Sequence, residues 1–319
     1  MRCLLPISLL ALILASGPLF SQTLSDPARA VSGLPAAAPS SDLLADTVTD
    51  DPGLDNPGVE APTSAADSDI GLQLILRNNE KKRHFRASVD TSAFWTDNAA
   101  NVSAGEQEDW FAVGGVNVTW QQRVKGRFIA DAQLGVHAFR YDQLQVLDYE
   151  YWDGNVGLIV QMPELWDTLL FAQYGYQRVT QDFDAAALYE AHSARLGLFR
   201  AFTINRLNSV FITVQSQLAL AAEPETLERH EHSASLGYTL RLSRTLNLQA
   251  SYRLVYYDYF NLEGRQDWYQ NAGLALTYRP KEWLELGLSY NYTVNRSNYD
   301  AFSFNSQLAG PSLAARIRF

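Results

Sequence analysis

Sulfur-containing residues are almost absent from this chain. Its 319 residues include one cysteine, Cys3, and two methionines. Cys3 lies before an apolar stretch over residues 4–15, which follows the base Arg2 and ends at Ser-Gly-Pro. This pattern predicts an export signal over residues 1–21, cleaved after Ser21, and the cysteine is wrongly placed for a lipid anchor. The exported chain would contain no cysteine, so disulfide bonds are excluded as a source of its stability.

Long apolar runs are also missing. No stretch approaches the roughly 20 apolar residues that a transmembrane helix needs. Yet 47% of the residues are hydrophobic and 12% are aromatic, while the mean hydropathy is −0.17. High apolar content without long runs is typical of strands that alternate apolar and polar side chains. The composition therefore excludes a helical membrane protein but allows a membrane barrel.

Basic residues are scarce. The chain has 25 Lys and Arg against 35 Asp and Glu, a net charge of −10, which argues against nucleic acid as a partner because phosphate binding needs clustered bases. Acidic residues are concentrated in residues 22–69, where Arg29 is the sole base and aromatic residues are lacking. The nine acids there are Asp26, Asp42, Asp46, Asp50, Asp51, Asp55, Glu60, Asp67 and Asp69. Such a segment cannot bury enough apolar area to offset the entropy of ordering, so we expect a disordered periplasmic arm. Residues 70–82 alternate briefly and then become charged; an edge strand, a short helix, a linker and a plug element all remain open for them.

From residue 83 to the end, apolar and polar residues alternate. In the last segment Leu313, Ile317 and Phe319 share one face, while Arg316 and Arg318 share the other. About twelve such segments follow one another, an even number as closed antiparallel barrels have. Short connections at 123–126, 163–166, 243–245 and 279–282 contrast with longer polar ones at 96–108, 221–228, 258–266 and 295–303. The expected fold is all-β: a transmembrane antiparallel β-barrel over residues 83–319, with periplasmic turns and extracellular loops.

Aromatic residues and glycines add detail to this barrel. Aromatic residues gather near both ends of the segments and predict two lipid-facing girdles: Trp95, Trp110, Trp152 and Trp268 near long loops, and Trp120, Trp166, Tyr278 and Trp283 near short turns. Eight glycines share the inward parity: Gly115, Gly135, Gly157, Gly175, Gly197, Gly237, Gly273 and Gly287. Inward glycines relieve crowding where a sheet is sharply curved, so we expect a narrow lumen.

The terminal strand, which ends at Phe319, resembles the last strand of bacterial outer-membrane β-barrels, whose final Phe is read by the barrel assembly machinery. This resemblance implies the bacterial outer membrane as location, with its lipid and the assembly machinery as partners. In size the chain is similar to twelve-stranded porin-like channels. Its early Phe85-Arg-Ala-Ser-Val89 and Trp95-Thr-Asp-Asn98 are similar to porin-like barrels linked to exopolysaccharide export. The resemblance implies passive passage of small hydrophilic solutes, without catalytic residues or cofactor.

The candidate lumen-lining residues are polar side chains at the inward parity. They are Asp131, Gln133, His137, Arg195, Gln215, Gln217, Arg241, Arg253, Asn271 and Arg316. Buried charges must be paired or hydrated, so this set predicts either a wet lumen or one filled by paired charges. Arginines are more frequent in the last five strands, which favours anions. A barrel filled by paired charges would instead be a non-conducting structural or interaction barrel.

Histidine and serine neighbours were tested as a catalytic pair. His232 and Ser233 are adjacent, as are His192 and Ser193, so each pair points to opposite faces of its strand. A nucleophile and its base must lie within hydrogen-bond reach, so no enzyme is expected, and a lipid-modifying enzyme is the least favoured function. His230 and His232 share a face, but two histidines without a third ligand do not define a metal site, and none is predicted.

Overall fold

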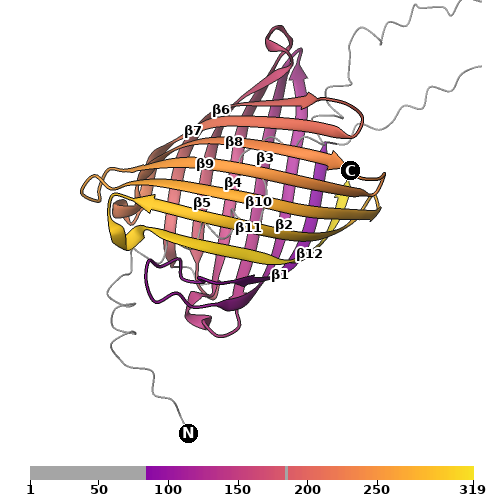
Figure 1. The fold of residues 1–319 in the computed structure, drawn as a ribbon. Helices are drawn as coiled ribbons and strands as arrows, with labels where there is room; N and C mark the ends of the chain where they lie inside the picture. Colours follow the sequence, from indigo (N-terminus) through magenta and orange to yellow (C-terminus); the bar gives the residue numbers. More distant parts are fainter. Residues whose placement is uncertain (1–83, 184–185) are drawn as a thin grey trace, which may run out of the picture.

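The computed structural model describes residues 84–183 and 186–319. The predicted export signal (1–21), acidic arm (22–69) and linker or plug element (70–82) lie outside the described residues, so they remain predictions. The described chain forms a closed antiparallel barrel of twelve strands, in which each strand pairs with its neighbours in sequence and β1 pairs with β12 (Figure 1). The predicted fold class and strand number are confirmed.

The strands are β1 (Phe85–Thr96), β2 (Asp109–Lys125), β3 (Phe128–Tyr141), β4 (Tyr149–Met162), β5 (Thr168–Thr180), β6 (Ala187–Thr203), β7 (Asn208–Glu223), β8 (Arg229–Arg241), β9 (Leu246–Tyr259), β10 (Gln266–Lys281), β11 (Leu284–Ser297) and β12 (Phe304–Arg318). Short 3₁₀ turns occur in four connections: η1 (Gln145–Leu147), η2 (Pro163–Leu165), η3 (Glu225–Leu227) and η4 (Asp300–Phe302). Among the described residues, no helix is long and apolar enough to cross a membrane.

The two ends of the barrel differ in their connections, as the sequence predicted. The long-loop end carries the connections 97–108, 142–148, 181–186, 224–228, 260–265 and 298–303. The short-turn end carries 126–127, 163–167, 204–207, 242–245 and 282–283, together with the start of β1 and the end of β12. Gly126 adopts a φ of 55° in the two-residue turn between β2 and β3, a backbone conformation that glycine accepts without strain.

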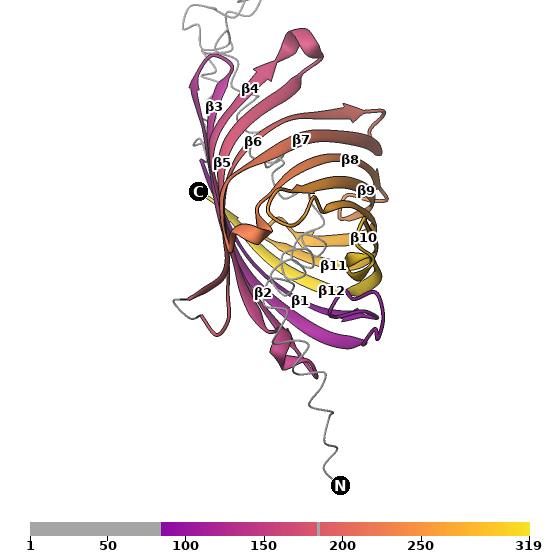
Figure 2. The ribbon, with the colours of Figure 1, turned by 90° about the vertical axis from the view of Figure 1, so that its left-hand side faces the viewer.

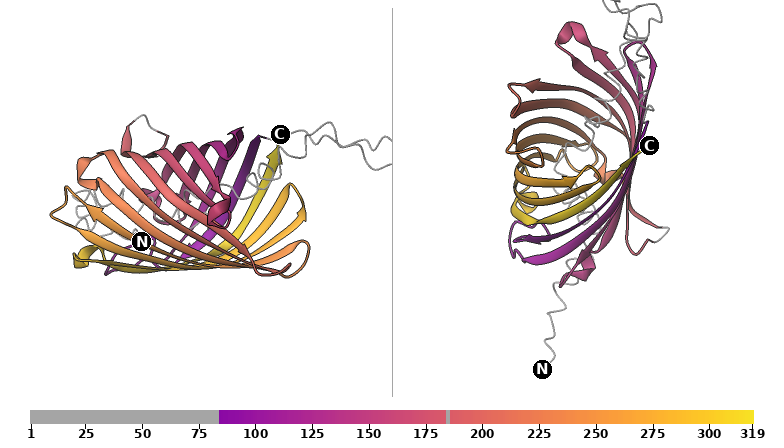
Figure 3. Two further views of the ribbon diagram at one scale, coloured as in Figure 1. Left: turned by 90° about the horizontal axis from the view of Figure 1, so that it is seen from above. Right: turned by 90° about the vertical axis from the view of Figure 1, so that its right-hand side faces the viewer.

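The barrel is not circular in cross-section. Strands β1–β5 form a flatter wall that faces the curved wall made by β6–β12, as both side views show (Figures 2 and 3). The strands run obliquely across one another on the two walls (Figure 3). A flattened barrel brings opposite inner faces closer together than a round one with the same number of strands would.

The outer surface is apolar. Leu134, Leu196 and Leu288 are more than half exposed, and they belong to rows of Leu and Val that follow the outward parity of every well-formed strand. Trp110 at the long-loop end and Trp283 at the short-turn end are 53% and 55% exposed, as expected of the two girdles. A closed barrel satisfies every backbone group within the sheet, and an apolar exterior suits lipid. This barrel is therefore a transmembrane barrel.

Closure of the barrel joins the two ends of the described sheet. Phe85 and Phe319 exchange backbone hydrogen bonds of 2.9 and 3.0 Å, and their rings stack with centroids 5.6 Å apart. The register continues along the seam through Ala87 opposite Ile317 and Val89 opposite Ala315. The terminal aromatic residue is thus a structural part of the seam.

Candidate functional site: the barrel lumen

The ten predicted lumen residues occupy inward positions on seven strands, at different depths. Asp131 and Gln133 lie on β3 and Arg195 lies on β6, whereas Arg241 and Arg316 lie at the short-turn end. Contacts join Asp131 to Gln133 and Arg195 to Gln217. The remaining members, His137, Gln215, Arg253 and Asn271, are spread along neighbouring strands. The set is therefore several local groups rather than one site.

The central group is named here the amide girdle: Gln121, Gln133, Asn155, Gln173 and Gln217 around Asp131 and Arg195. The Asp131 carboxylate, which is fully buried, accepts hydrogen bonds from Gln121 Nε2 at 2.6 Å, Gln173 Nε2 at 2.7 Å and Gln133 Nε2 at 3.4 Å. Arg195, 3% exposed, donates from Nε to Gln217 Oε1 at 2.8 Å and from Nη1 to Asn155 Oδ1. Side-chain amides thus compensate both buried charges.

The register explains how the amide girdle forms. A single lateral row crosses β2 to β7 through Gln121, Asp131, Gly157, Gln173, Arg195 and Gln217. Gly157 separates Asp131 from Gln173, and the missing side chain lets the Gln173 amide reach over it to the carboxylate. A Cβ at Gly157 would overlap the Ala172 backbone oxygen and lie 2.6 Å from Gln173 Cα and 2.8 Å from Gln173 Cγ, so a side chain there would displace β5 as well as the Gln173 side chain. The sequence predicted that inward glycines relieve crowding, and Gly157 does so by leaving room for the Gln173 side chain.

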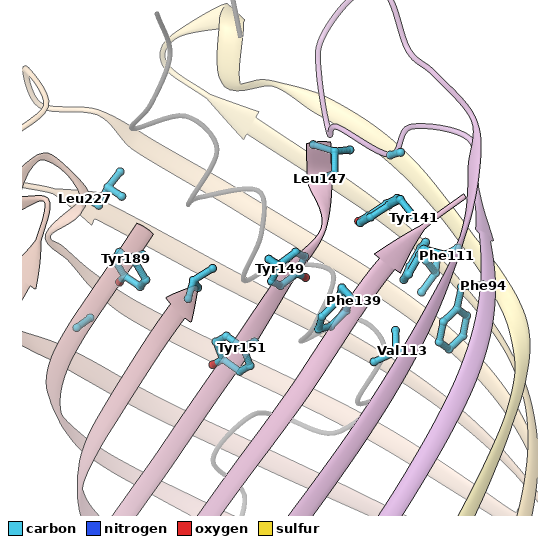
Figure 4. Close-up of a cluster of buried hydrophobic side chains, with 14 residues drawn as sticks. Phe94, Phe111, Val113, Phe139, Tyr141, Leu147, Tyr149, Tyr151, Tyr189 and Leu227 are labelled. Carbon is cyan, nitrogen blue, oxygen red and sulfur yellow. The ribbon is translucent and has the colours of Figure 1, made fainter. Parts of the chain in front are cut away.

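A second group, which sequence reasoning missed, lies inside the barrel at the long-loop end (Figure 4). This aromatic ladder consists of Phe94, Phe111, Tyr141, Phe139 and Tyr149 on β1 to β4. Ring centroids are 5.7 Å apart for Phe94 and Phe111, 4.9 Å for Phe111 and Tyr141, and 4.3 Å for Phe139 and Tyr149. The sequence predicted aromatic girdles that face lipid, and an aromatic cluster inside the barrel was not among the predictions. The signal was present in the sequence, because Phe94, Phe111 and Phe139 all stand at the inward parity.

Loops fold over the aromatic ladder and are held there by buried polar groups. Leu147 of η1 and Leu227 of η3 pack into the same cluster (Figure 4). Asn98, almost fully buried, donates from Nδ2 to Val102 O at 2.8 Å and to Asn305 O at 2.9 Å, which ties loop 97–108 to β12. Asp109 accepts the backbone N–H of Leu144 at 2.8 Å and so holds loop 142–148. The long-loop end is therefore capped by ordered chain.

A small pocket remains beneath this cap. Rings from both walls line it: Phe111 and Tyr141 on one side and Tyr269 and Phe304 on the other. Thr96, Asn98, Asn101, Thr293 and Ser306 supply its polar lining. A solute that enters here meets ring faces and neutral hydrogen-bonding groups together.

Pairing between strands brings a serine and a histidine together that are far apart in the sequence. Along a single strand His232 cannot reach a serine, but the register places Ser216 of β7 directly opposite it, with Ser216 Oγ 2.9 Å from His232 Nδ1. Both side chains face outward, and the His232 ring stacks on Tyr256. Among the described residues, no carboxylate forms a hydrogen bond that would orient His232. Nor do residues 84–183 and 186–319 contain a group of three His, Cys, Asp or Glu that could hold a metal ion.

Comparison with known proteins supports the architecture. No family model and no curated protein matches the sequence. An outer membrane channel from Pseudomonas putida F1 matches with a TM-score of 0.54 at 8% identity, over 74% of this chain and 96% of that one. The outer membrane channel DcaP of Acinetobacter baumannii matches with a TM-score of 0.43 at 8% identity, over 73% and 96%. The first of these likenesses shows a shared fold. With its apolar exterior, aromatic girdles and closed sheet, the chain has the fold of a transmembrane β-barrel, similar to that of the Pseudomonas putida channel.

Proposed function

We propose that this barrel is a passive, porin-like channel for small hydrophilic solutes. The amide girdle carries the proposal. Side-chain amides both donate and accept hydrogen bonds without a net charge, so they can replace water around an uncharged polar solute. Asp131 and Arg195 add one charge of each sign in the same lateral row of the sheet. The ten lumen residues named from the sequence would line this path.

The test is single-channel recording of the refolded chain, residues 22–319, in a planar bilayer. Discrete current steps, reduced by an uncharged sugar small enough to enter, support the channel. A folded and inserted preparation that stays silent contradicts it. Folding is checked separately by the mobility shift of heated and unheated samples on a gel.

A second candidate function rests on the aromatic ladder. Phe139 and Tyr149 are at most 1% exposed, and loop residues Leu147 and Leu227 pack against the same cluster. A cap packed this closely favours a non-conducting structural or interaction barrel, in which the loops present a binding surface. Absence of current from a folded and inserted preparation would favour this non-conducting barrel over the channel.

We propose no catalytic role for Ser216 and His232. Their hydrogen bond satisfies two polar groups on the outward face, and an enzyme would also need a group that orients the histidine. Release of fatty acid from outer-membrane lipid, lost in Ser216→Ala, would contradict this assignment.

We further propose that Phe319 is the contact for the barrel assembly machinery, and that outer-membrane lipid surrounds the aromatic girdles.

A further inference from the structure

One arginine stands on the lipid-facing surface of the barrel near its short-turn end. Arg200 lies on β6 at the outward parity, between Leu198 and Phe202 on the same face and three residues before the strand ends at Thr203. In the register it stands opposite Ile212 of β7. A charged side chain among apolar neighbours at the lipid face is costly unless its charge is compensated.

Two aromatic rings hold the Arg200 guanidinium. Its Cζ lies 4.1 Å from the centroid of the Phe202 ring and 5.0 Å from that of Trp166, which is 73% exposed in the turn that contains η2. Both distances are within the range of cation–π attraction. Trp166 belongs to the predicted girdle, and girdle residues lie at the level of the lipid head groups. The rings of two different elements therefore hold the guanidinium at head-group level.

Arg200 has no acidic partner in the described chain. Glu164 and Asp167 lie in the same turn as Trp166, yet Glu164 pairs with Arg127 at 3.3 Å, and within residues 84–183 and 186–319 neither acid forms an ion pair with Arg200. Its Nε is buried without a hydrogen-bond partner, while the side chain as a whole is only partly buried. Aromatic rings attract a cation but do not neutralise it. The guanidinium therefore keeps its charge for an anion that approaches from the membrane side.

The surroundings of Arg200 identify this anion as part of a lipid. Leu196, Leu198 and Ile212 continue the outward face toward the middle of the membrane and are 56%, 44% and 40% exposed. An acyl chain that lies along these side chains places its head group at the level of Arg200. Arginine binds phosphate through two parallel N–H···O bonds. A zwitterionic head group brings its own cation beside the phosphate, so an anionic head group compensates the arginine better.

Packing inside the barrel holds this part of β6 in place. Phe199, the residue before Arg200, points inward, and its ring centroid lies 6.4 Å from that of Phe211 on β7. Both rings pack in a buried cluster that includes Ile129 and Ile159. A site on a packed strand has little ordering entropy left to lose when it binds a ligand.

We propose that Arg200, together with Trp166 and Phe202, binds the phosphate of an anionic phospholipid at the short-turn rim of the barrel. The phosphate oxygens accept hydrogen bonds from the guanidinium, and the two rings hold the guanidinium in position. The acyl chains lie against Leu198 and Ile212. Because the site is on the outer surface, the proposal does not depend on whether the lumen conducts.

The experiment is native mass spectrometry of the refolded chain, residues 22–319, in an uncharged detergent titrated with phosphatidylglycerol. We expect the native sequence to retain phosphatidylglycerol more tightly than phosphatidylcholine, whose head group is zwitterionic. Arg200→Gln should weaken the binding of phosphatidylglycerol about fivefold, as expected for the loss of one arginine at a membrane surface. The affinity for phosphatidylcholine should change less.

Three further variants separate the site from a general effect of charge. Arg244→Gln removes an exposed arginine from the short turn 242–245 at the same end of the barrel, and it should leave the affinity nearly unchanged. Arg200→Lys keeps the charge without the planar fork, so it should retain part of the binding. Trp166→Leu keeps an apolar surface but removes one ring, and it should also weaken the binding.

Several results would overturn the proposal. Equal losses in Arg200→Gln and Arg244→Gln would assign the binding to net charge, and equal affinities for the two lipids would remove the role of the anion. Displacement of the lipid by inorganic phosphate would identify a site for a free anion instead. If Arg200→Gln fails to refold, Arg200→Lys and Trp166→Leu decide, because native affinity in both would contradict the site.

Discussion

Gly157 is the residue on which the amide girdle depends, because the Gln173 side chain crosses the space above it to reach Asp131. We expect Gly157→Ala to push back the β5 backbone at Ala172 and Gln173, and so to leave the buried carboxylate with one donor fewer. The cost should be about 1–3 kcal/mol of the free energy of unfolding, since a lost bond to a charged buried group is expensive. Urea titration of the barrel in detergent measures it.

Gly114 provides the control for this prediction. It lies on the same sheet, and a Cβ built there meets no atom within 4 Å. Gly114→Ala should therefore leave stability nearly unchanged. Similar losses of stability in Gly157→Ala and Gly114→Ala would mean that the position of the glycine does not matter. The amide girdle would then have no special role.

Asn98 is the second residue with a local task, the attachment of loop 97–108 to β12. Asn98→Ala removes two donated bonds and the bond that Oδ1 accepts from Val102 N at 3.0 Å. We expect proteolytic cleavage within the loop to become at least several-fold faster, while the barrel strands stay protected. Ser103→Ala, an exposed position in the same loop, should cleave at the native rate.

Asp131 gives a charge-specific prediction at the same scale. Asp131→Asn keeps the shape but replaces an acceptor oxygen by a donor, which faces the amide groups of Gln121 and Gln173. If the barrel conducts, the change also removes a negative charge from the path, so the reversal potential in a salt gradient should shift toward anion selectivity. An unchanged reversal potential would show that ions do not pass Asp131.

At the scale of the element, the seam between β1 and β12 closes the barrel, and its last contact is made by the terminal aromatic residue Phe319. Phe319→Ala removes the ring that stacks on Phe85. We expect about 0.5–1.5 kcal/mol of lost stability from the missing ring contact, because the Phe319 side chain is 62% exposed and adds little burial. Assembly in cells should fall further if Phe319 is also the signal that the assembly machinery reads.

Phe85→Ala distinguishes these two roles. It removes the same stacking contact but keeps the terminal Phe. Stability in vitro should drop by a similar amount in both variants, whereas assembly yield should drop more in Phe319→Ala. Equal yields would assign Phe319 to closure alone.

The elements also show what the sequence could and could not predict. Alternation identified the strands and their lipid faces, because parity is a property of one strand. The contact of Gln173 with Asp131 and that of Ser216 with His232 depend on register between strands, which parity does not determine. The aromatic ladder was missed for another reason: the predicted girdles accounted for Trp and Tyr near strand ends, whereas Phe94 and Phe139 stand at the inward parity of their strands.

At the scale of the whole molecule, the two ends of the barrel differ in charge: the described loops at the long-loop end hold ten acids and one base, whereas Arg86, Arg241, Arg316 and Arg318 lie at the short-turn end. This difference has an electrical consequence. An acidic entrance on one side and arginines on the other make the barrel behave as a junction between a cation-rich and an anion-rich compartment. Such a junction passes current more easily in one direction, so a conducting barrel should act as a rectifier, with unequal currents at equal positive and negative voltage. The direction of the larger current would then show, without any label, which way each molecule had inserted into the bilayer.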